Sequence, residues 1–155
     1  MAARTPALEA LARAGVPHRV HEYGHDPAAP SYGLEAAAKL GVDPGRVFKT
    51  LIAEIEGKPL VAVVPVEAEL DLRSLGKRAA MLKPADAERI TGYVAGGISP
   101  LAQRRRLPTL LDESALALET IFVSAGRRGL EVELAPGDLL ALTGGEFRAV
   151  STRRG

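Results

Sequence analysis

Two consecutive runs of β-forming residues place the strongest constraint on the fold of this chain. They span residues 47–55 and 60–66, and the four residues between them, Glu56-Gly57-Lys58-Pro59, are typical of a tight connection. The pattern therefore predicts a β-hairpin. In the first run, alternate residues from Phe48 share one face, and the opposite face carries Lys49 beside Leu51. Both faces of this strand are thus largely apolar, and a lysine lies within one of them.

Weaker signals surround the hairpin. Thr5-Pro6 followed by apolar residues predicts a helix that ends at Gly15, and two prolines among residues 25–31 predict a loop. Helices and strands follow without regular alternation, which favours one domain of mixed α/β, α+β-like architecture over residues 1–155. Strands are also expected at 18–23, 108–111, 121–124, 130–134 and 147–150, helices at 34–40, 72–79, 84–90 and 137–142, an irregular segment at 92–100 and a turn at 127–129.

The composition is that of a globular protein with a core of its own. Of 155 residues, 46% are hydrophobic and 25% are charged. The chain has no cysteine, which excludes disulfides, thiolate metal sites and a cysteine nucleophile. No apolar run approaches the roughly 18 residues of a membrane span, and residues 1–15 lack the apolar stretch of a signal peptide. We therefore expect a cytoplasmic protein that does not associate with membranes.

Lys49 is the first candidate functional residue, because lysine is rarely buried without a partner. Two interpretations are open. In one, the side chain simply reaches solvent from an alternating strand. In the other, it is partly desolvated, and its ammonium group binds a phosphate, a carboxylate or an ester carbonyl oxygen.

A glycine-rich segment, residues 93–100, is the second candidate. Gly96 and Gly97 would let the backbone approach a ligand and present N–H groups to it, although they also suit a sharp turn. Ser124 ends a strand beside small turn residues and is open to the same two interpretations. The three histidines, all within residues 18–25, lack the accompanying ligands of a metal site, so none is predicted.

Taken together and in order, these segments resemble the YbaK/EbsC family of free-standing aminoacyl-tRNA deacylases, which is related to the editing domain of bacterial prolyl-tRNA synthetase. The similarity extends over nearly the whole chain and points to the branch that acts on Cys-tRNA(Pro) and Cys-tRNA(Cys). The matching segments are residues 5–7, 20–27, Val47-Phe48-Lys49-Thr50-Leu51, 70–72, 91–93, Gly96-Gly97-Ile98-Ser99-Pro100, 106–109, 124–130, 133–134 and 137–139.

The resemblance implies a partly barrel-like mixed sheet flanked by short helices, with Lys49 as the catalytic residue of a pocket that needs no cofactor and no metal. Two positions depart from the family pattern, since Tyr32 stands where a phenylalanine is expected and Glu131 where an aspartate is expected. The substrate-binding residues that the resemblance implies are Tyr23, Tyr32, Thr50, Gly96, Gly97, Ile98, Ser99, Ser124 and Glu131.

The resemblance also implies a mechanism and partners. The thiol of the cysteinyl substrate attacks its own ester, and Lys49 either favours the thiolate or anchors the terminal adenosine or its phosphate. Exposed arginines would bind the acceptor end of tRNA, and prolyl-tRNA synthetase would supply tRNA specificity. The alternatives are a deacylase for another substrate such as Ala-tRNA(Pro) and a non-catalytic module that binds tRNA or synthetase; the oligomeric state stays open. The candidate tRNA-binding residues are Arg104, Arg105, Arg106, Arg127 and Arg128.

Overall fold

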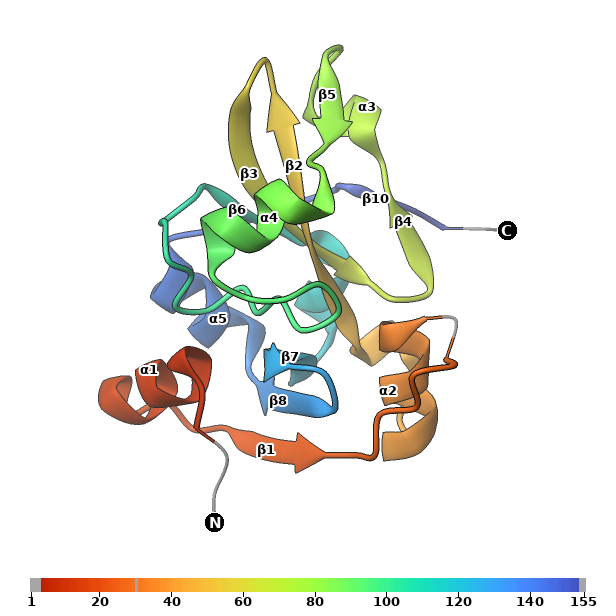
Figure 1. Cartoon of the computed structure of the whole chain (residues 1–155), viewed down its shortest axis with the longest axis vertical. Helices are drawn as coiled ribbons and strands as arrows, with labels where there is room; N and C mark the ends of the chain where they lie inside the picture. Colours follow the sequence, from red (N-terminus) through yellow and green to blue (C-terminus); the bar gives the residue numbers. More distant parts are fainter. Residues whose placement is uncertain (1–3, 30, 154–155) are drawn as a thin grey trace.

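The computed structural model describes residues 4–29 and 31–153, and Figure 1 shows how its helices and strands are arranged. None of the helices in the described residues is long and apolar enough to span a membrane. The elements in chain order are α1 (Pro6–Ala14), β1 (Arg19–Glu22), α2 (Tyr32–Leu40), η1 (Pro44–Arg46), β2 (Phe48–Ile55), β3 (Lys58–Pro65), β4 (Ala68–Leu70), α3 (Leu72–Leu75), β5 (Ala79–Met81), α4 (Pro84–Thr91), β6 (Thr109–Asp112), η2 (Glu113–Ala117), β7 (Ile121–Arg127), β8 (Leu130–Leu134), α5 (Pro136–Thr143), β9 (Glu146–Arg148) and β10 (Ser151–Arg153).

The predicted hairpin is confirmed as β2 and β3, which form the middle of a five-stranded sheet in the order β5-β2-β3-β6-β9. Its turn is shorter than expected, because β3 already begins at Lys58. Glu56 and Gly57 both have positive φ, of 51° and 81°. Such a pair of conformations matches the twist of an antiparallel hairpin, so two residues suffice to connect the strands. β6 then joins β3 in parallel, which makes the sheet mixed.

A second sheet of three strands, in the order β1-β8-β7, lies below the hairpin in Figure 1. A parallel bridge between Val47 and Phe122 connects the start of β2 to β7. The remaining strands, β4 and β10, pair with each other as a third sheet. The mixed α/β class is therefore confirmed, whereas the barrel-like expectation needs correction: the described strands form three separate sheets and do not close on themselves.

Strand β2 separates two hydrophobic clusters. Phe48 and Ile52 pack into the larger one, between the two main sheets, whereas Ala53 belongs to a second cluster on the opposite face. Leu51 packs against that second cluster. Both faces of β2 are apolar, as the alternation of residues predicts, because each is covered by other elements. A strand that is covered on both sides holds its few polar residues firmly in place.

Two expected elements differ from the sequence prediction. The helix expected over residues 72–79 is only α3, Leu72–Leu75, and residues 79–81 form strand β5 instead. Gly76 breaks the helix with a φ of 146°, which residues with a side chain rarely adopt. β5 then pairs with β2, as Ala79 opposite Ile55. The last expected strand, 147–150, is split into β9 and β10.

Candidate functional site

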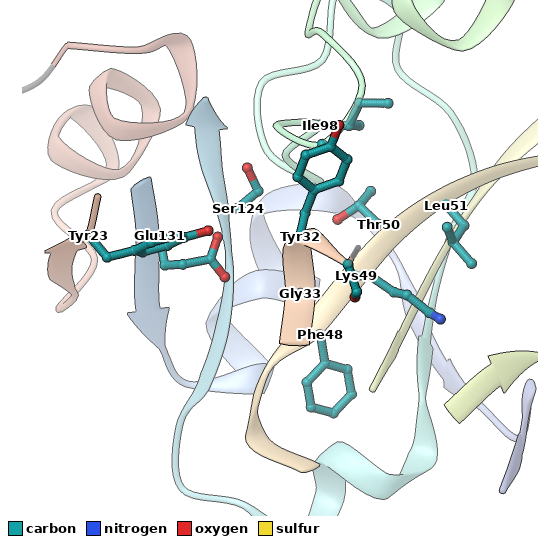
Figure 2. Close-up of a pocket in the computed structure, with 12 residues that line it drawn as sticks. Tyr23, Tyr32, Gly33, Phe48, Lys49, Thr50, Leu51, Ile98, Ser124 and Glu131 are labelled. Atoms are coloured by element: carbon teal, nitrogen blue, oxygen red, sulfur yellow. The ribbon is translucent and has the colours of Figure 1, made fainter. Parts of the chain in front are cut away.

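A cavity of about 280 Å³ opens where the two main sheets, helix α2 and the loop after α4 meet. Figure 2 shows most of its side chains, with Glu131 and Ser124 on one side and β2 on the other. The cavity brings together eight of the ten residues predicted for the catalytic and substrate-binding site. The lining residues are Tyr23, Ser31, Tyr32, Gly33, Phe48, Lys49, Thr50, Leu51, Gly96, Ile98, Ser124 and Glu131.

Glu131 is the carboxyl group of the cavity. It lies on the central strand β8, opposite Ser124 on β7 and His21 on β1, so it is enclosed by strands on both sides. Its side chain is 7% exposed, and burial raises the pKa of the Glu131 carboxyl to about 8. The group is therefore protonated over much of the neutral range, and it ionises readily when a cationic partner approaches.

Tyr23 stands beside this carboxyl group (Figure 2). Its backbone N–H donates to the Gly129 carbonyl at 3.0 Å, which continues the pairing of the β1 end with the β7–β8 turn. Burial, then the charges of Glu131 and Glu35, raise the pKa of the Tyr23 hydroxyl to about 12. Tyr23 consequently offers a neutral hydroxyl to a ligand, one able to donate a hydrogen bond.

Strand β2 places Lys49 and Thr50 on opposite faces, as the period of a strand requires. In Figure 2 the Thr50 hydroxyl turns toward the side of Ser124, and the Lys49 side chain extends in the other direction. The Thr50 Oγ1 atom is buried and has no hydrogen-bond partner among the described residues. A buried hydroxyl without a partner costs free energy unless a ligand supplies one. Lys49 thus borders the cavity at its edge, while Thr50 directs a polar atom into it.

The loop of residues 92–100 forms the upper rim and is fixed at Ala95. The Glu88 carboxylate of α4 accepts a hydrogen bond from the Ala95 N–H at 2.7 Å, and the Arg128 Nε donates to the Ala95 carbonyl at 2.8 Å. One peptide segment is thus bonded from two different elements. This anchoring sets the position of Gly96, whose φ is 84°.

Gly97 and Ser99 do not line the cavity, although the resemblance implied that they bind substrate. A Cβ atom on Gly97 would lie 2.8 Å from the Arg127 Cα, so this glycine allows the loop to pack on the β7–β8 turn. Ser99 is fully buried, and its Oγ accepts from the Leu101 N–H at 3.2 Å. Both residues shape the loop rather than contact the cavity.

Helix α2 supplies the fourth wall and begins at the cavity. Ser31 caps the helix by accepting from the Leu34 N–H at 3.3 Å. The buried Glu35 accepts from His25 Nδ1 at 2.8 Å, from the Asp26 N–H at 2.7 Å and from Lys39 Nζ at 3.1 Å. These bonds, that of His25 most of all, lower the pKa of the Glu35 carboxyl to about 2. The network fixes the preceding loop against α2.

Sequence reasoning missed four lining residues: Ser31, Gly33, Phe48 and Leu51. A helix cap at Ser31 is visible in the sequence as a serine three residues before Leu34. For Gly33 the signal exists only in three dimensions, because a Cβ there would meet the Val66 Cγ1 at 2.2 Å. The glycine lets α2 approach the end of β3 closely enough to close the wall.

Histidines and arginines occupy other positions. His21 bonds to Glu133 at 3.0 Å and His25 to Glu35, and the described residues include no group of three or more His, Cys, Asp or Glu able to hold a metal. All five arginines predicted to bind tRNA are exposed. Two of them lie next to the rim loop: Arg127 is the last residue of β7, and Arg128 begins the β7–β8 turn.

Comparisons with known proteins agree with the geometry. Residues 26–142 match the aminoacyl-tRNA editing domain family. EbsC of Enterococcus faecalis, named as a candidate Cys-tRNA(Pro)/Cys-tRNA(Cys) deacylase, is 38% identical over 157 residues, which cover 97% of this chain and 94% of that protein. The uncharacterised protein YwhH of Bacillus subtilis is 30% identical over 110 residues, 68% of this chain and 70% of that protein.

A solved structure shares the fold as well. It belongs to a candidate trans-editing enzyme for prolyl-tRNA synthetase, with a TM-score of 0.82 and 26% identity over 99% of this chain and 100% of that one. The family resemblance inferred from the sequence motifs is thereby confirmed. The chain belongs to the aminoacyl-tRNA editing domain family.

Proposed function

We propose that this chain is a trans-editing deacylase whose substrates are Cys-tRNA(Pro) and Cys-tRNA(Cys), and that residues 1–155 act as one editing domain. One observation carries the proposal. The cavity surrounds a space suited to a small aminoacyl group with a buried carboxyl and several hydroxyls, but the Ser124 and Thr50 hydroxyls are not paired with a base: Ser124 Oγ accepts from the Gly126 N–H, and Thr50 Oγ1 has no hydrogen-bond partner among the described residues.

The lack of such a pair favours a substrate that brings its own nucleophile. The chain has no cysteine. Ser124 Oγ accepts a hydrogen bond from the Gly126 N–H at 3.2 Å, and none of the lining residues is a histidine that could remove its proton. An aminoacyl ester is already activated, so positioning and stabilisation of the developing charge suffice for cleavage.

The proposed step uses the thiol of the cysteinyl group. The thiol loses its proton to solvent, the sulfur attacks the ester carbonyl carbon, and the bond from that carbon to the ribose oxygen breaks. The ribose oxygen takes up a proton, and cysteine leaves as a strained cyclic thioester that water opens. A thiol has a pKa near 8.5, and a nearby ammonium group raises its thiolate fraction. Lys49 borders the cavity at its edge, and its ammonium group is the proposed source of that positive charge, acting through space rather than by contact with the sulfur.

Glu131 is the proposed partner of the substrate α-amino group. The ammonium group would lower the raised pKa of the Glu131 carboxyl and form an ion pair with it in a buried setting. A glutamate extends further than the aspartate of the family pattern and reduces the space left for the aminoacyl side chain. Both effects suit a small amino acid such as cysteine.

Binding of the tRNA itself is assigned to the exposed arginines of the rim and the neighbouring loop, Arg104, Arg105, Arg106, Arg127 and Arg128. Phosphate contacts carry little sequence information. A synthetase pocket also discriminates between similar small side chains by only about 1–3 kcal/mol, which is why a second editing site is needed. We therefore propose that prolyl-tRNA synthetase is the partner that supplies tRNA identity.

The test is a deacylation assay with Cys-, Ala- and Pro-charged tRNA(Pro), using the full chain and the variants Lys49→Ala and Lys58→Ala. Lys58 is exposed at the start of β3, so its removal controls for the loss of a positive charge. We expect Cys-tRNA to decay at least tenfold faster than without enzyme, Pro-tRNA to persist, and only Lys49→Ala to lose turnover.

Other outcomes would select the alternatives. Preferred cleavage of Ala-tRNA would point to a water nucleophile and a different substrate. Binding of tRNA without cleavage of any ester would identify a non-catalytic module. Rapid cleavage of a tRNA charged with α-aminobutyrate, which replaces the thiol by a methyl group, would exclude the substrate-thiol step while leaving the activity in place.

A further inference from the structure

Arg128 differs from the other exposed arginines because it is held at the mouth of the cavity. Its Nε donates to the Ala95 carbonyl at 2.8 Å, and its guanidinium carbon lies 4.8 Å from the centre of the Tyr32 ring. A Cβ on Gly96 would lie 2.8 Å from the same Nε. Arg128 thus contacts two residues of the cavity lining, Tyr32 and Gly96, and closes the rim between α2 and the loop of residues 92–100.

These contacts leave part of the guanidinium available. The group has five N–H donors in a fixed plane, and one of them is used on Ala95. Within residues 4–29 and 31–153, Arg128 forms no ion pair with a carboxylate, unlike Arg46, which pairs with Glu133 at 3.3 Å. Stacking on Tyr32 and the bond to Ala95 fix the plane in advance, so little side-chain entropy remains to be lost on binding an anion.

The chemistry of the substrate places an anion at this rim. The aminoacyl group is esterified to the ribose of the terminal nucleotide, and the same ribose carries the 5′-phosphate that connects it to the rest of the tRNA. With the ester inside the cavity, that phosphate lies one ribose away, outside the mouth. Arginine binds phosphate oxygens with two parallel N–H donors, which the free edge of Arg128 still offers.

Among the described residues, none of the other four arginines predicted to bind tRNA has a side chain held by both a hydrogen bond and an aromatic ring. Arg127 precedes Arg128 as the last residue of β7, and its backbone packs on Gly97, but within residues 4–29 and 31–153 no hydrogen bond or ring contact holds its exposed side chain. Arg104 and Arg105 use their backbone N–H groups to cap α4, on Thr91 and Ile90.

We propose that Arg128 is the receptor for the 5′-phosphate of the terminal nucleotide of the bound tRNA. This assignment deepens the proposed function and rests on it for the identity of the substrate. The Ala95 carbonyl and the Tyr32 ring orient the guanidinium, and the remaining arginines contribute only to general attraction of the tRNA backbone. The specific role thus belongs to one residue of a five-residue basic set.

The test measures binding of 5′-AMP and of adenosine to the full chain by NMR titration, which requires no turnover. Wild type is expected to bind 5′-AMP about tenfold more tightly than adenosine, the size of one charge-assisted contact. Arg128→Ala should abolish that preference and leave adenosine affinity within about twofold. Arg127→Ala, which removes the same charge one residue earlier at the end of β7, should keep the preference for 5′-AMP. Arg128→Lys should retain only part of the preference for 5′-AMP over adenosine, because lysine lacks the planar, two-donor edge of the guanidinium group.

Several results would overturn the proposal. One is a wild type without preference for 5′-AMP, and another is an equal loss in Arg127→Ala. A third is a parallel fall in both affinities in Arg128→Ala, which would show that Arg128 only holds the rim. If 5′-AMP binds as expected but no charged tRNA is cleaved, the proposed function fails and the phosphate site stands.

Discussion

At the scale of single residues, Thr50 offers the sharpest test of the cavity. Its Oγ1 is buried without a hydrogen-bond partner among the described residues, and valine, which has a similar shape, replaces this hydroxyl by a methyl group. Replacing such a hydroxyl by a methyl removes a desolvation penalty, so Thr50→Val should be more stable than wild type by about 1 kcal/mol. If the hydroxyl bonds the substrate ester, the same variant should lose about tenfold in kcat/KM.

Urea unfolding and a Cys-tRNA deacylation assay measure the two effects separately. Thr50→Ser is the matched control, because it keeps the hydroxyl and loses only the methyl group. It should therefore retain activity and lose stability, the opposite of the valine variant. A valine variant that is both more stable and fully active would show that Thr50 has no role in catalysis.

Residue identities at the site were largely predictable, but side-chain directions were not. The motifs around Tyr23, Thr50, Ser124 and Glu131 placed all four at the cavity, because three of them lie on a strand whose alternation fixes the face and Tyr23 directly follows β1. Gly97 and Ser99 lie in an irregular loop without such a period, and there a motif identifies the segment and leaves open which atoms face inward. The role proposed for Arg128 depends on its contact with Ala95, which a sequence does not display.

At the scale of elements, helix α2 depends on close packing that only glycine allows. A Cβ on Gly33 would lie 2.2 Å from the Val66 Cγ1, far inside van der Waals contact. Gly33→Ala should therefore destabilise the protein by about 1–3 kcal/mol, despite the better helix propensity of alanine. Because α2 forms one wall of the cavity, the same variant should also weaken binding of the cysteinyl substrate.

Gly137 provides the comparison for this variant. It lies in helix α5, and a Cβ there would meet no atom of the described residues within 4 Å. Gly137→Ala should therefore stabilise the protein by up to about 1 kcal/mol. Thermal unfolding of both variants checks the pair, and a Gly33→Ala protein as stable as Gly137→Ala would contradict the packing argument.

Elements with strong local signals were predictable, and those that depend on distant partners were not. The hairpin of β2 and β3 and the helices with a proline near the start and a glycine after the end follow from local patterns. β5 is a strand because it adds to the edge of β2, and its own residues, Ala79 to Met81, give no strand signal. The predicted helix of residues 72–79 therefore reached the first residue of β5, and no strand was expected there.

At the scale of the whole molecule, the site exists because the sheets meet at a few long-range contacts. The Val47–Phe122 bridge joins β2 to β7, and the Thr5 hydroxyl donates to the Ala125 carbonyl at 2.5 Å, which ties α1 to the same strand. Such pairings connect residues 75 to 120 positions apart and leave no trace in the periodicity of either segment. The sequence accordingly predicted the fold class without showing that the strands divide into three sheets.

Buried carboxyl groups with opposite pKa shifts should give the protein a stability maximum in mildly acidic solution. The folded pKa of Glu35 is about 2, below its ordinary value of 4.5, so its contribution is present above pH 4.5 and is lost as the pH falls toward 2. The folded pKa of Glu131 is about 8, above its ordinary value, so its contribution is present below pH 4.5 and is lost as the pH rises through 8. We expect the free energy of unfolding to be highest at roughly pH 4–6 and to fall on both sides.

Glu131→Gln separates the two limbs of this profile. The glutamine cannot ionise, so the decline in stability between pH 4.5 and 8 should flatten, and the variant should be more stable than wild type by at most about 5 kcal/mol at pH 9.

Glu133→Gln, on the same strand, is the matched control. The pKa of the Glu133 carboxyl is lowered, mainly by the hydrogen bond from the Thr120 hydroxyl. Glu133→Gln should therefore be less stable than wild type at pH 7, and its stability should fall above pH 5 in the same way as that of wild type. Urea unfolding of the three proteins from pH 3 to 9 measures these effects. Parallel curves for wild type and Glu131→Gln above pH 5 would show that Glu131 is already ionised in the folded protein, and that its pairing with an α-amino group needs no change in protonation.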